Sequence, residues 1–256
     1  MTRIWRVLVY VKLMALSIII PALNEELALP ATLASLAALS PAPHEIIVVD
    51  GASSDCTSDI AEAAGVRLVH GQPTGRASQM NEGARAASGD QICFVHADTI
   101  LPTDFVSLVE GVLTDKDTAL AGCVSVMAGR KLRWMTTAHN FIKTWYAPLL
   151  FRPVLFFKGV RLLFGDQAMF CRREDFEAIG GFDPAQTIME EADLCQRMVC
   201  AGRGRVRQVN RKVWSSDRRV ASWGAFRANL TYLYVGILWG FGAEPKRLAR
   251  HYKDVR

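Results

Sequence analysis

The 256-residue sequence lacks the features of several common protein classes. Its six cysteines form no CxxC pair and no cysteine–histidine arrangement that would complete a zinc site, so we expect reduced thiols like those of cytosolic proteins. No G-x-G-x-x-G motif follows the first predicted strand, and no P-loop motif occurs anywhere. These absences disfavour a zinc protein, a dinucleotide-binding domain and a P-loop nucleotidase.

Long apolar runs, linkers and repeats are missing as well. Residues 1–13 are apolar but interrupted by Arg6 and Lys12, and no small-residue cleavage site follows, which disfavours a signal peptide or a spanning helix. We expect residues 1–14 to form an N-terminal extension, and Met14 is an alternative natural start. Half of the residues are hydrophobic, so the remaining chain can form one large domain or two closely joined halves.

Charge is unevenly distributed along the chain. The formal net charge is +5, but residues 203–256 carry thirteen Lys and Arg against three acidic residues, which leaves −5 for residues 1–202. A basic C-terminal part would face an anionic surface, such as lipid headgroups or a diphosphate. No recognisable nucleic-acid-binding module accompanies it, so we expect no nucleic-acid partner.

Strands and helices alternate regularly over residues 15–95. Apolar, mostly β-branched runs predict parallel strands at 15–20, 45–50, 66–69 and 92–95, and helical patterns fill the intervals. This arrangement predicts a doubly wound α/β half. Asp50 and Asp98 end two of the strands, and Glu25 closely follows the first. Ligands of open α/β sheets bind beyond the carboxyl ends of the strands, so these carboxylates indicate a ligand site.

Asp98 is central to this prediction. A rigidly mounted strand-end carboxylate suits a divalent cation that carries phosphate oxygens. An equally good interpretation is that Asp98 caps a helix beginning near Pro102. Taken singly, Asp50 could form a turn, Glu25 could be a first-turn helix charge and Arg76 a solvated cap.

The second half is less regular. We predict a strand at 119–127, one or two helices over 130–146, a turn and strand at 164–172, and a helix through Met198. Residues 146–157 are strongly apolar and twice interrupted by proline, which suits a hydrophobic surface loop or a core segment.

Taken in order, the motifs resemble those of glycosyltransferase family 2, the inverting GT-A type. The resemblance covers roughly residues 15–215 and rests on six segments: Ser17 to Glu26, Val48 to Asp55, Gly75-Arg76 to Asn81, His96-Ala97-Asp98, Gly180-Gly181-Phe182, and Glu190-Glu191-Ala192-Asp193-Leu194. Gly165-Asp166-Gln167 and Ser216-Asp217-Arg218-Arg219 look most like a bacterial subgroup of small, single-domain members.

The resemblance implies a GT-A fold, with a Rossmann-like, mostly parallel sheet flanked by helices and a smaller acceptor-side half. The catalytic domain would span 15–215, and 216–256 would be a basic, apolar, helical C-terminal segment. A UDP- or GDP-linked sugar would lie over the first half. The implied donor-side residues are Pro21, Glu25 and Asp50 around the base and ribose, Arg76 near the base or diphosphate, and Ala97 and Asp98.

The same resemblance implies the chemistry. Asp98 would hold Mg²⁺ or Mn²⁺ against the diphosphate, and Glu191 would take the proton of an acceptor hydroxyl as it attacks the anomeric carbon. Gly165, Asp166, Gln167 and Asp193 are acceptor-side candidates.

The sequence departs from the family pattern at three positions. Asp50 is followed by Gly51 instead of a second acid, and the usual Asp-x-Asp is His96-Ala97-Asp98. His96 could be a second metal ligand or a packed, hydrogen-bonded residue. The acidic pair is Glu190-Glu191 where Glu-Asp is commoner, which leaves the base open between the two glutamates.

Other functions remain compatible with the sequence. A sugar-nucleotide nucleotidyltransferase shares the fold, but its glycine-rich loop after the first strand is missing here. A non-catalytic nucleotide-sugar-binding or scaffold protein is suggested by the incomplete Asp-x-Asp.

Residues 230–241 give a further expectation. They are apolar, contain Tyr and Trp and are flanked by basic residues, but they are too short to span a bilayer. They could form a helix packed on the catalytic body. Our alternative hypothesis is a helix in the headgroup layer that brings a cytoplasmic enzyme to the inner membrane face, where a lipid-linked acceptor would be met.

Overall fold

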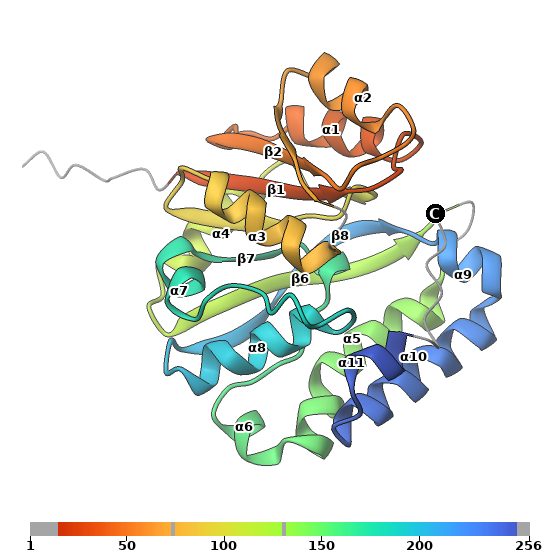
Figure 1. Cartoon of the computed structure of the whole chain (residues 1–256). Coiled ribbons are helices and arrows are strands. Elements are labelled where there is room, and N and C mark those ends of the chain that lie inside the picture. Colours follow the sequence, from red (N-terminus) through yellow and green to blue (C-terminus); the bar gives the residue numbers. More distant parts are fainter. Residues whose placement is uncertain (1–14, 73–74, 130–131, 250–256) are drawn as a thin grey trace, which may run out of the picture.

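A single mixed sheet organises the computed structural model, which describes residues 15–72, 75–129 and 132–249. The predicted extension at 1–14 lies outside the described residues. Within them the sheet has eight strands in the order β3-β2-β1-β4-β7-β6-β8-β5 (Figure 1). The strands are β1 (Leu16–Ala22), β2 (Glu45–Asp50), β3 (Arg67–His70), β4 (Gln91–Phe94), β5 (Thr99–Ile100), β6 (Thr118–Ala128), β7 (Met169–Arg172) and β8 (Arg205–Ser216).

The first four strands are all parallel, as the sequence predicts. The helices between them are α1 (Leu29–Ala37), α2 (Thr57–Ala63) and α3 (Arg76–Ala86). Successive side chains of β1 enter opposite cores, Ile19 on one face of the sheet and Ile18 and Ile20 on the other. Helices cover both faces, and this explains why β1 is buried at every position and apolar at all of them except Ser17.

The first strand ends later than predicted. Pro21 pairs in register with Val49 of β2, and β1 continues to Ala22. The nitrogen of Pro21, which carries no hydrogen, faces β4. Ile19, two residues earlier, faces the same neighbour, because its carbonyl accepts a hydrogen bond from the Val95 N–H. The pairing of β4 with β1 ends at Phe94, so no ladder bond is lost there.

The second half adds β7 in antiparallel orientation between β4 and β6, and β8 beside β6. Its helical elements are α4 (Phe105–Leu113), α5 (Trp134–Phe151), α6 (Pro153–Phe157), the 3₁₀ turn η1 (Gly165–Gln167), α7 (Arg173–Ala178), α8 (Glu190–Cys200), α9 (Arg218–Trp223), α10 (Ala225–Gly240) and α11 (Pro245–Ala249). The predicted strand at 119–127 is β6, and the predicted turn and strand at 164–172 are η1 and β7.

The proline-containing segment at 146–157 is helical, contrary to our expectation of a loop or core segment. Helix α5 continues through Pro148, and α6 begins at Pro153. Pro148 cannot donate to the carbonyl of Thr144, and that carbonyl instead accepts a hydrogen bond from the Leu162 N–H at 3.2 Å. A contact from a distant loop therefore satisfies the group that proline leaves free.

Among the C-terminal helices, α10 lies against α5, and α9 and α11 lie against α10; in Figure 1 this group is at the lower right, and α1 and α2 are at the top. Helix α10 packs along α5, with Asn229 bonded to Thr136 and the ring of Phe241 5.5 Å from that of Phe151. One face of α10 is therefore packed on the rest of the protein, as the first interpretation of residues 230–241 expects. Among the described residues, no helix is long and apolar enough to cross a membrane.

Candidate active site

A cavity of about 500 Å³ lies at the carboxyl ends of β1 and β4. The strand order β3-β2-β1-β4 makes this the point where the direction of winding reverses, which is where open α/β sheets bind ligands. Nine of the twelve residues predicted for the site line it: Pro21, Glu25, Arg76, Ala97, Asp98, Gly165, Asp166, Glu190 and Glu191. The tertiary structure therefore joins segments that are up to 170 positions apart in the sequence.

Asp98 is held by a cation from the C-terminal part of the chain. The Arg218 guanidinium donates to Asp98 Oδ2 at 3.1 Å and to Glu25 Oε2 at 2.8 Å. Burial raises the pKa of Glu25, although Arg218 opposes that effect. The helix-cap interpretation of Asp98 is wrong, because α4 begins at Phe105 and is preceded by Asp104.

Arg218 is a site residue that sequence reasoning missed. The Ser216–Arg219 segment is part of the resemblance, but no role followed from it. Pairing of β5 with β8 places Thr99 opposite Ser215, and the Ser216 N–H bonds to the carbonyl of Asp98 at 3.3 Å. This pairing brings Arg218 into the cavity, and only a long-range strand contact could have shown it.

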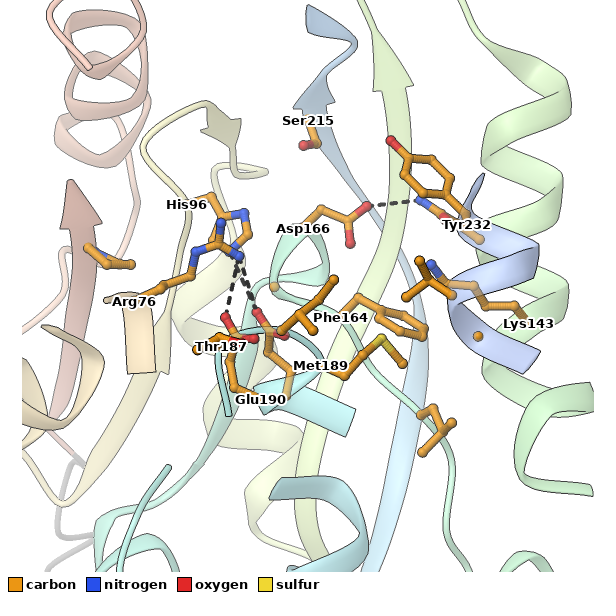
Figure 2. Close-up of a pocket in the computed structure, with 18 of the residues that line it drawn as sticks. Arg76, His96, Lys143, Phe164, Asp166, Thr187, Met189, Glu190, Ser215 and Tyr232 are labelled. Carbon is orange, nitrogen blue, oxygen red and sulfur yellow. Dashed lines mark hydrogen bonds and ion pairs between the residues drawn. The ribbon is translucent and has the colours of Figure 1, made fainter. Parts of the chain in front are cut away.

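The acidic pair occupies the first turn of α8. Met189, immediately before it, has φ of 65°, a left-handed conformation that is uncommon for a non-glycine residue. Arg76, at the start of α3, reaches both carboxylates, at 3.5 Å from Glu190 Oε1 and 3.8 Å from Glu191 Oε1, as Figure 2 shows for Arg76 and Glu190. The helix N-terminus adds further positive potential to both.

The two glutamates have different protonation behaviour. Burial and the neighbouring Glu191 raise the pKa of Glu190 to about 7. Burial also acts on Glu191, but His96 and Arg76 outweigh it, so the pKa of Glu191 is lowered. Glu191 is therefore the carboxylate that stays ionised at neutral pH. Among the described residues, its buried Oε1 has no hydrogen-bond partner.

His96 lies beside this pair. Its Nε2 is 3.8 Å from Glu191 Oε1 and, like that oxygen, is buried without a hydrogen-bond partner in the described part of the chain. Gly165 packs so closely against both groups that a Cβ at this position would overlap His96 Nε2 and contact Glu191 Oε1. The glycine is needed for space and not for backbone freedom.

The far side of the cavity is built by α5, η1 and α10. Asn140 is buried, donates to Asp166 Oδ2 at 3.0 Å, and has an Oδ1 without a partner among the described residues. The Lys143 ammonium lies 3.6 Å from the centre of the Phe164 ring and 5.6 Å from that of Tyr232. Figure 2 shows Lys143 and Tyr232 opposite Arg76 and Glu190. Burial lowers the pKa of Lys143 to about 8, against the opposing effect of Asp166 and Glu191.

The family model described as Glycosyl transferase family 2 matches residues 17–180. The chain belongs to glycosyl transferase family 2. A PGL/p-HBAD biosynthesis glycosyltransferase of Mycobacterium bovis (strain BCG) is 30% identical over 191 residues, which are 70% of this chain and 67% of that relative. An uncharacterized glycosyltransferase of Mycobacterium tuberculosis (strain H37Rv) is 27% identical over 131 residues, 51% of this chain, and the match spans only 58% of that protein's length.

Solved structures establish the fold of this family 2 chain. Glucosyl-3-phosphoglycerate synthase from Mycobacterium tuberculosis aligns with a TM-score of 0.60 at 24% identity, over 90% of this chain and 81% of that one. A mannosyltransferase from Pyrobaculum calidifontis, solved with GDP-Man and Mn²⁺, aligns with a TM-score of 0.67 at 17% identity, over 93% and 68% of the two chains. The predicted α/β, GT-A fold class is confirmed.

Three predicted residues of this family 2 chain do not line the cavity. Asp50 accepts hydrogen bonds from Ser53 and from the Ser58 hydroxyl and so fixes the loop after β2. Gln167 is buried and bonds to the Phe164 N–H. Asp193 forms an i,i+4 ion pair with Arg197 at 2.6 Å. Through these contacts, Asp50 and Gln167 stabilise loops next to the cavity, and Asp193 stabilises helix α8.

The side chains at the cavity wall are compatible with a divalent cation, but only if substrate oxygens complete its coordination. The described residues contain no group of three or more His, Cys, Asp and Glu side chains that could hold a metal ion. Mg²⁺ is commonly bound through one or two carboxylates together with substrate phosphates, and Asp98 supplies such a carboxylate at the cavity wall. The Nε2 atom of His96, two positions earlier in the chain, lies 3.8 Å from Glu191 Oε1.

We expect Glu190→Gln to stabilise the protein at pH 8 and to leave its stability nearly unchanged at pH 4. The folded-state pKa of Glu190 is raised to about 7, so the folded wild type binds a proton more tightly than the unfolded chain. The stabilisation of the fold by this proton is fully present below pH 4.5 and is lost as pH rises through 7. Above pH 7 both buried carboxylates are charged and repel each other. Glutamine removes this repulsion, so we expect the free energy of unfolding at pH 8 to increase by on the order of 2 kcal/mol.

Chemical denaturation of wild type and Glu190→Gln at the two pH values measures this difference. Glu177→Gln, which neutralises an exposed carboxylate in an i,i+4 ion pair, is the control and should show little pH dependence. An equal change in stability at pH 4 and pH 8 would show that Glu190 is not buried as a neutral acid.

Gly165→Ala tests the close packing around His96 and Glu191. The added methyl group would displace one of these side chains, so we expect turnover to fall by about tenfold or more while the protein remains folded. Gly111→Ala is the matched control, because a Cβ there meets nothing within 4 Å in helix α4. Unchanged turnover in Gly165→Ala would mean that the positions of His96 and Glu191 are not critical.

Proposed function

We propose that the protein is an inverting glycosyltransferase that moves a sugar from a nucleotide-diphosphate donor to an acceptor hydroxyl. The observation that carries this proposal is one cavity with Asp98 and Arg218 at one end and Glu191 at the other, ionised and with an Oε1 that accepts no hydrogen bond from the described residues. One end suits an anionic leaving group, and the other suits proton abstraction. Family membership supports the reaction class.

The donor would occupy the half of the cavity formed by the first four strands. Pro21, Glu25 and Ala97 line the carboxyl ends of β1 and β4, where the base and ribose would lie. Arg76 and Arg218 flank the space on two sides and would contact the diphosphate. Asp98 would hold Mn²⁺ or Mg²⁺, which neutralises charge on the departing nucleoside diphosphate. Solved relatives contain UDP or GDP-Man together with Mn²⁺, which supports this class of donor.

The transfer would proceed in one displacement. The acceptor oxygen bonds to the anomeric carbon as the bond from that carbon to the diphosphate oxygen breaks, and the bonding electrons leave with the nucleoside diphosphate. Glu191 Oε takes the hydroxyl proton. Attack from the face opposite the leaving group inverts the configuration. Glu190, held by Arg76, keeps its proton up to about pH 7 and so limits the negative charge beside the base.

The acceptor would occupy the half built by α5 and α10. Its walls are largely apolar, and the polar groups Asp166, Asn140 and Lys143 lie close to the catalytic pair. This lining fits an amphiphilic acceptor, such as a lipid-linked one, whose hydroxyl lies near Glu191 and whose apolar part extends between the helices. Such an enzyme would act in the cytoplasm at the inner face of a membrane. Gly165 contributes the space that the His96 ring and the Glu191 carboxylate occupy beside the acceptor.

A donor panel tests the proposal. Purified protein is incubated with UDP- and GDP-linked sugars and Mn²⁺ or Mg²⁺, and nucleoside diphosphate release is measured with and without amphiphilic acceptors. Metal-dependent release that increases with acceptor supports the transferase. Binding of every donor without turnover would instead support a scaffold. Formation of a nucleotide sugar from a sugar phosphate and a nucleoside triphosphate, with pyrophosphate release, would support a nucleotidyltransferase.

A further inference from the structure

Helix α5 has its polarity reversed relative to an ordinary surface helix. The residues it buries are Thr136, Asn140, Thr144 and Pro148, at i,i+4 spacing. The opposite side exposes large apolar side chains, including Trp134 at 69%, Ile142 at 53% and Leu150 at 66%. Surface helices of water-soluble domains normally place their apolar stripe toward the core. The outer face of α5 is therefore suited to an apolar environment.

Helix α10 extends this exposed apolar face. Phe226, Leu230, Leu233, Tyr234 and Ile237 are exposed at helical spacing along one side, and Phe241 follows the helix. Helices α5 and α10 are parallel neighbours, because Asn229 bonds to Thr136 near one end and Phe241 packs on Phe151 near the other. They lie side by side in Figure 1. Their outer faces consequently form one continuous surface.

Exposed apolar side chains are concentrated on this surface. Of the eighteen large hydrophobic residues that are exposed in the described part of the chain, sixteen lie at 132–157 or 226–241, and the other two are Leu27 and Trp214. Most soluble monomers have no apolar patch of this extent, and larger ones mark interaction sites. We call the exposed apolar residues of α5, α6 and α10, with Leu132 and Phe241, the apolar face.

Charge distinguishes between the possible partners of the apolar face. The sequence has no Asp or Glu between Asp117 and Asp166, and none from Arg218 to Ala243, whereas these two stretches contain ten Lys and Arg. Arg133 and Arg218 are ion-paired with acids from elsewhere, but Lys158 and Arg227 are exposed beside apolar residues. A symmetric contact between two copies would bring these like charges together. Anionic lipid headgroups complement them.

We propose that the apolar face docks onto an anionic phospholipid bilayer, with α5, α6 and α10 lying in the interface and without crossing it. Trp134, Trp145 and Tyr234 belong to the residue types that settle at headgroup depth. Leu233 and Ile237 are exposed on the apolar face and also line the cavity, so an amphiphile in the bilayer has a direct route to the site. Docking does not depend on the proposed transferase activity.

Vesicle co-sedimentation of the full chain, without substrates, tests this proposal. We expect binding to phosphatidylcholine vesicles containing about a third phosphatidylglycerol, weaker binding to phosphatidylcholine alone, and partial release by salt. The double variant Trp134→Ser, Phe226→Ser removes one exposed side chain from each helix, neither of which lines the cavity. It should weaken binding by on the order of tenfold or more.

Leu27→Ser is the matched control, because Leu27 is the most exposed of these hydrophobic residues at 89% and lies outside the apolar face. Its vesicle affinity should equal that of the wild type. Equal recovery of wild-type protein in the supernatant with and without anionic vesicles would overturn the proposal. So would self-association by analytical ultracentrifugation that the double variant abolishes while vesicle binding is absent, because a second copy would then cover the face. Vesicle binding without sugar transfer would keep the docking surface and refute only the proposed function.

Discussion

Replacing Glu191 with glutamine is expected to lower turnover by about 10²-fold or more while leaving donor affinity unchanged. Glutamine has nearly the same shape but cannot accept the hydroxyl proton. Glu191 is the member of the pair whose pKa is lowered, by His96 and Arg76 against the effect of burial, so it is ionised and able to act as a base at neutral pH. Steady-state kinetics together with donor-binding calorimetry measure the two effects separately.

Glu190→Gln is the comparison that decides between the two glutamates. Glu190 lies 3.5 Å from Arg76 on the donor side and has its pKa raised to about 7, so its amide variant should retain much more turnover than Glu191→Gln. A Glu190→Gln enzyme that is inactive beside an active Glu191→Gln enzyme would reassign the base to Glu190. Retention of near wild-type turnover by both variants would exclude a general base in this pair.

Asp98→Ala is expected to weaken metal-dependent donor binding by about a hundredfold or more while the protein stays folded. Asp98 lies after the end of β4 at the cavity wall and contributes little to either core. Its removal takes away the carboxylate that would hold the metal and leaves Arg218 with Glu25 as its remaining ion-pair partner among the described residues. Calorimetric titration with UDP and GDP, in Mn²⁺ and again in chelator, measures the loss.

Asp104→Ala is the control for the removal of a carboxylate. Asp104 pairs with Arg211 outside the cavity, so this variant should bind donor like the wild type. Equal donor affinity of Asp98→Ala and wild type in Mn²⁺ would contradict the assignment of Asp98 as the metal ligand. An Asp98→Ala protein that binds donor equally well with and without metal would point to Arg76 and Arg218 as the groups that neutralise the diphosphate.

The half of the fold formed by the first four strands could be predicted because its signals are local. Each strand of 15–95 is a short apolar run bounded by turn residues, and parallel strands place their carboxyl ends on one edge. That geometry alone brings Glu25 and Asp98 together. The resemblance added Arg76 and the acidic pair, which line the same cavity. The structure of residues 146–157 was harder to predict. Pro148 fits in the helix because the Leu162 N–H bonds to the carbonyl that proline leaves free, and no local pattern shows this contact.

The sequence by itself determined the α/β alternation, the family and most of the predicted residues that line the cavity, because backbone preferences, apolar periodicity and motifs are properties of short segments. Only the tertiary structure decided the charge balance of the site. Pairing of β5 with β8 carries Arg218 to Asp98, and packing of η1 sets Gly165 against His96 and Glu191. It also decided which side of α5 faces outward, since an amphipathic pattern shows that two faces differ but not which one the sheet will bury.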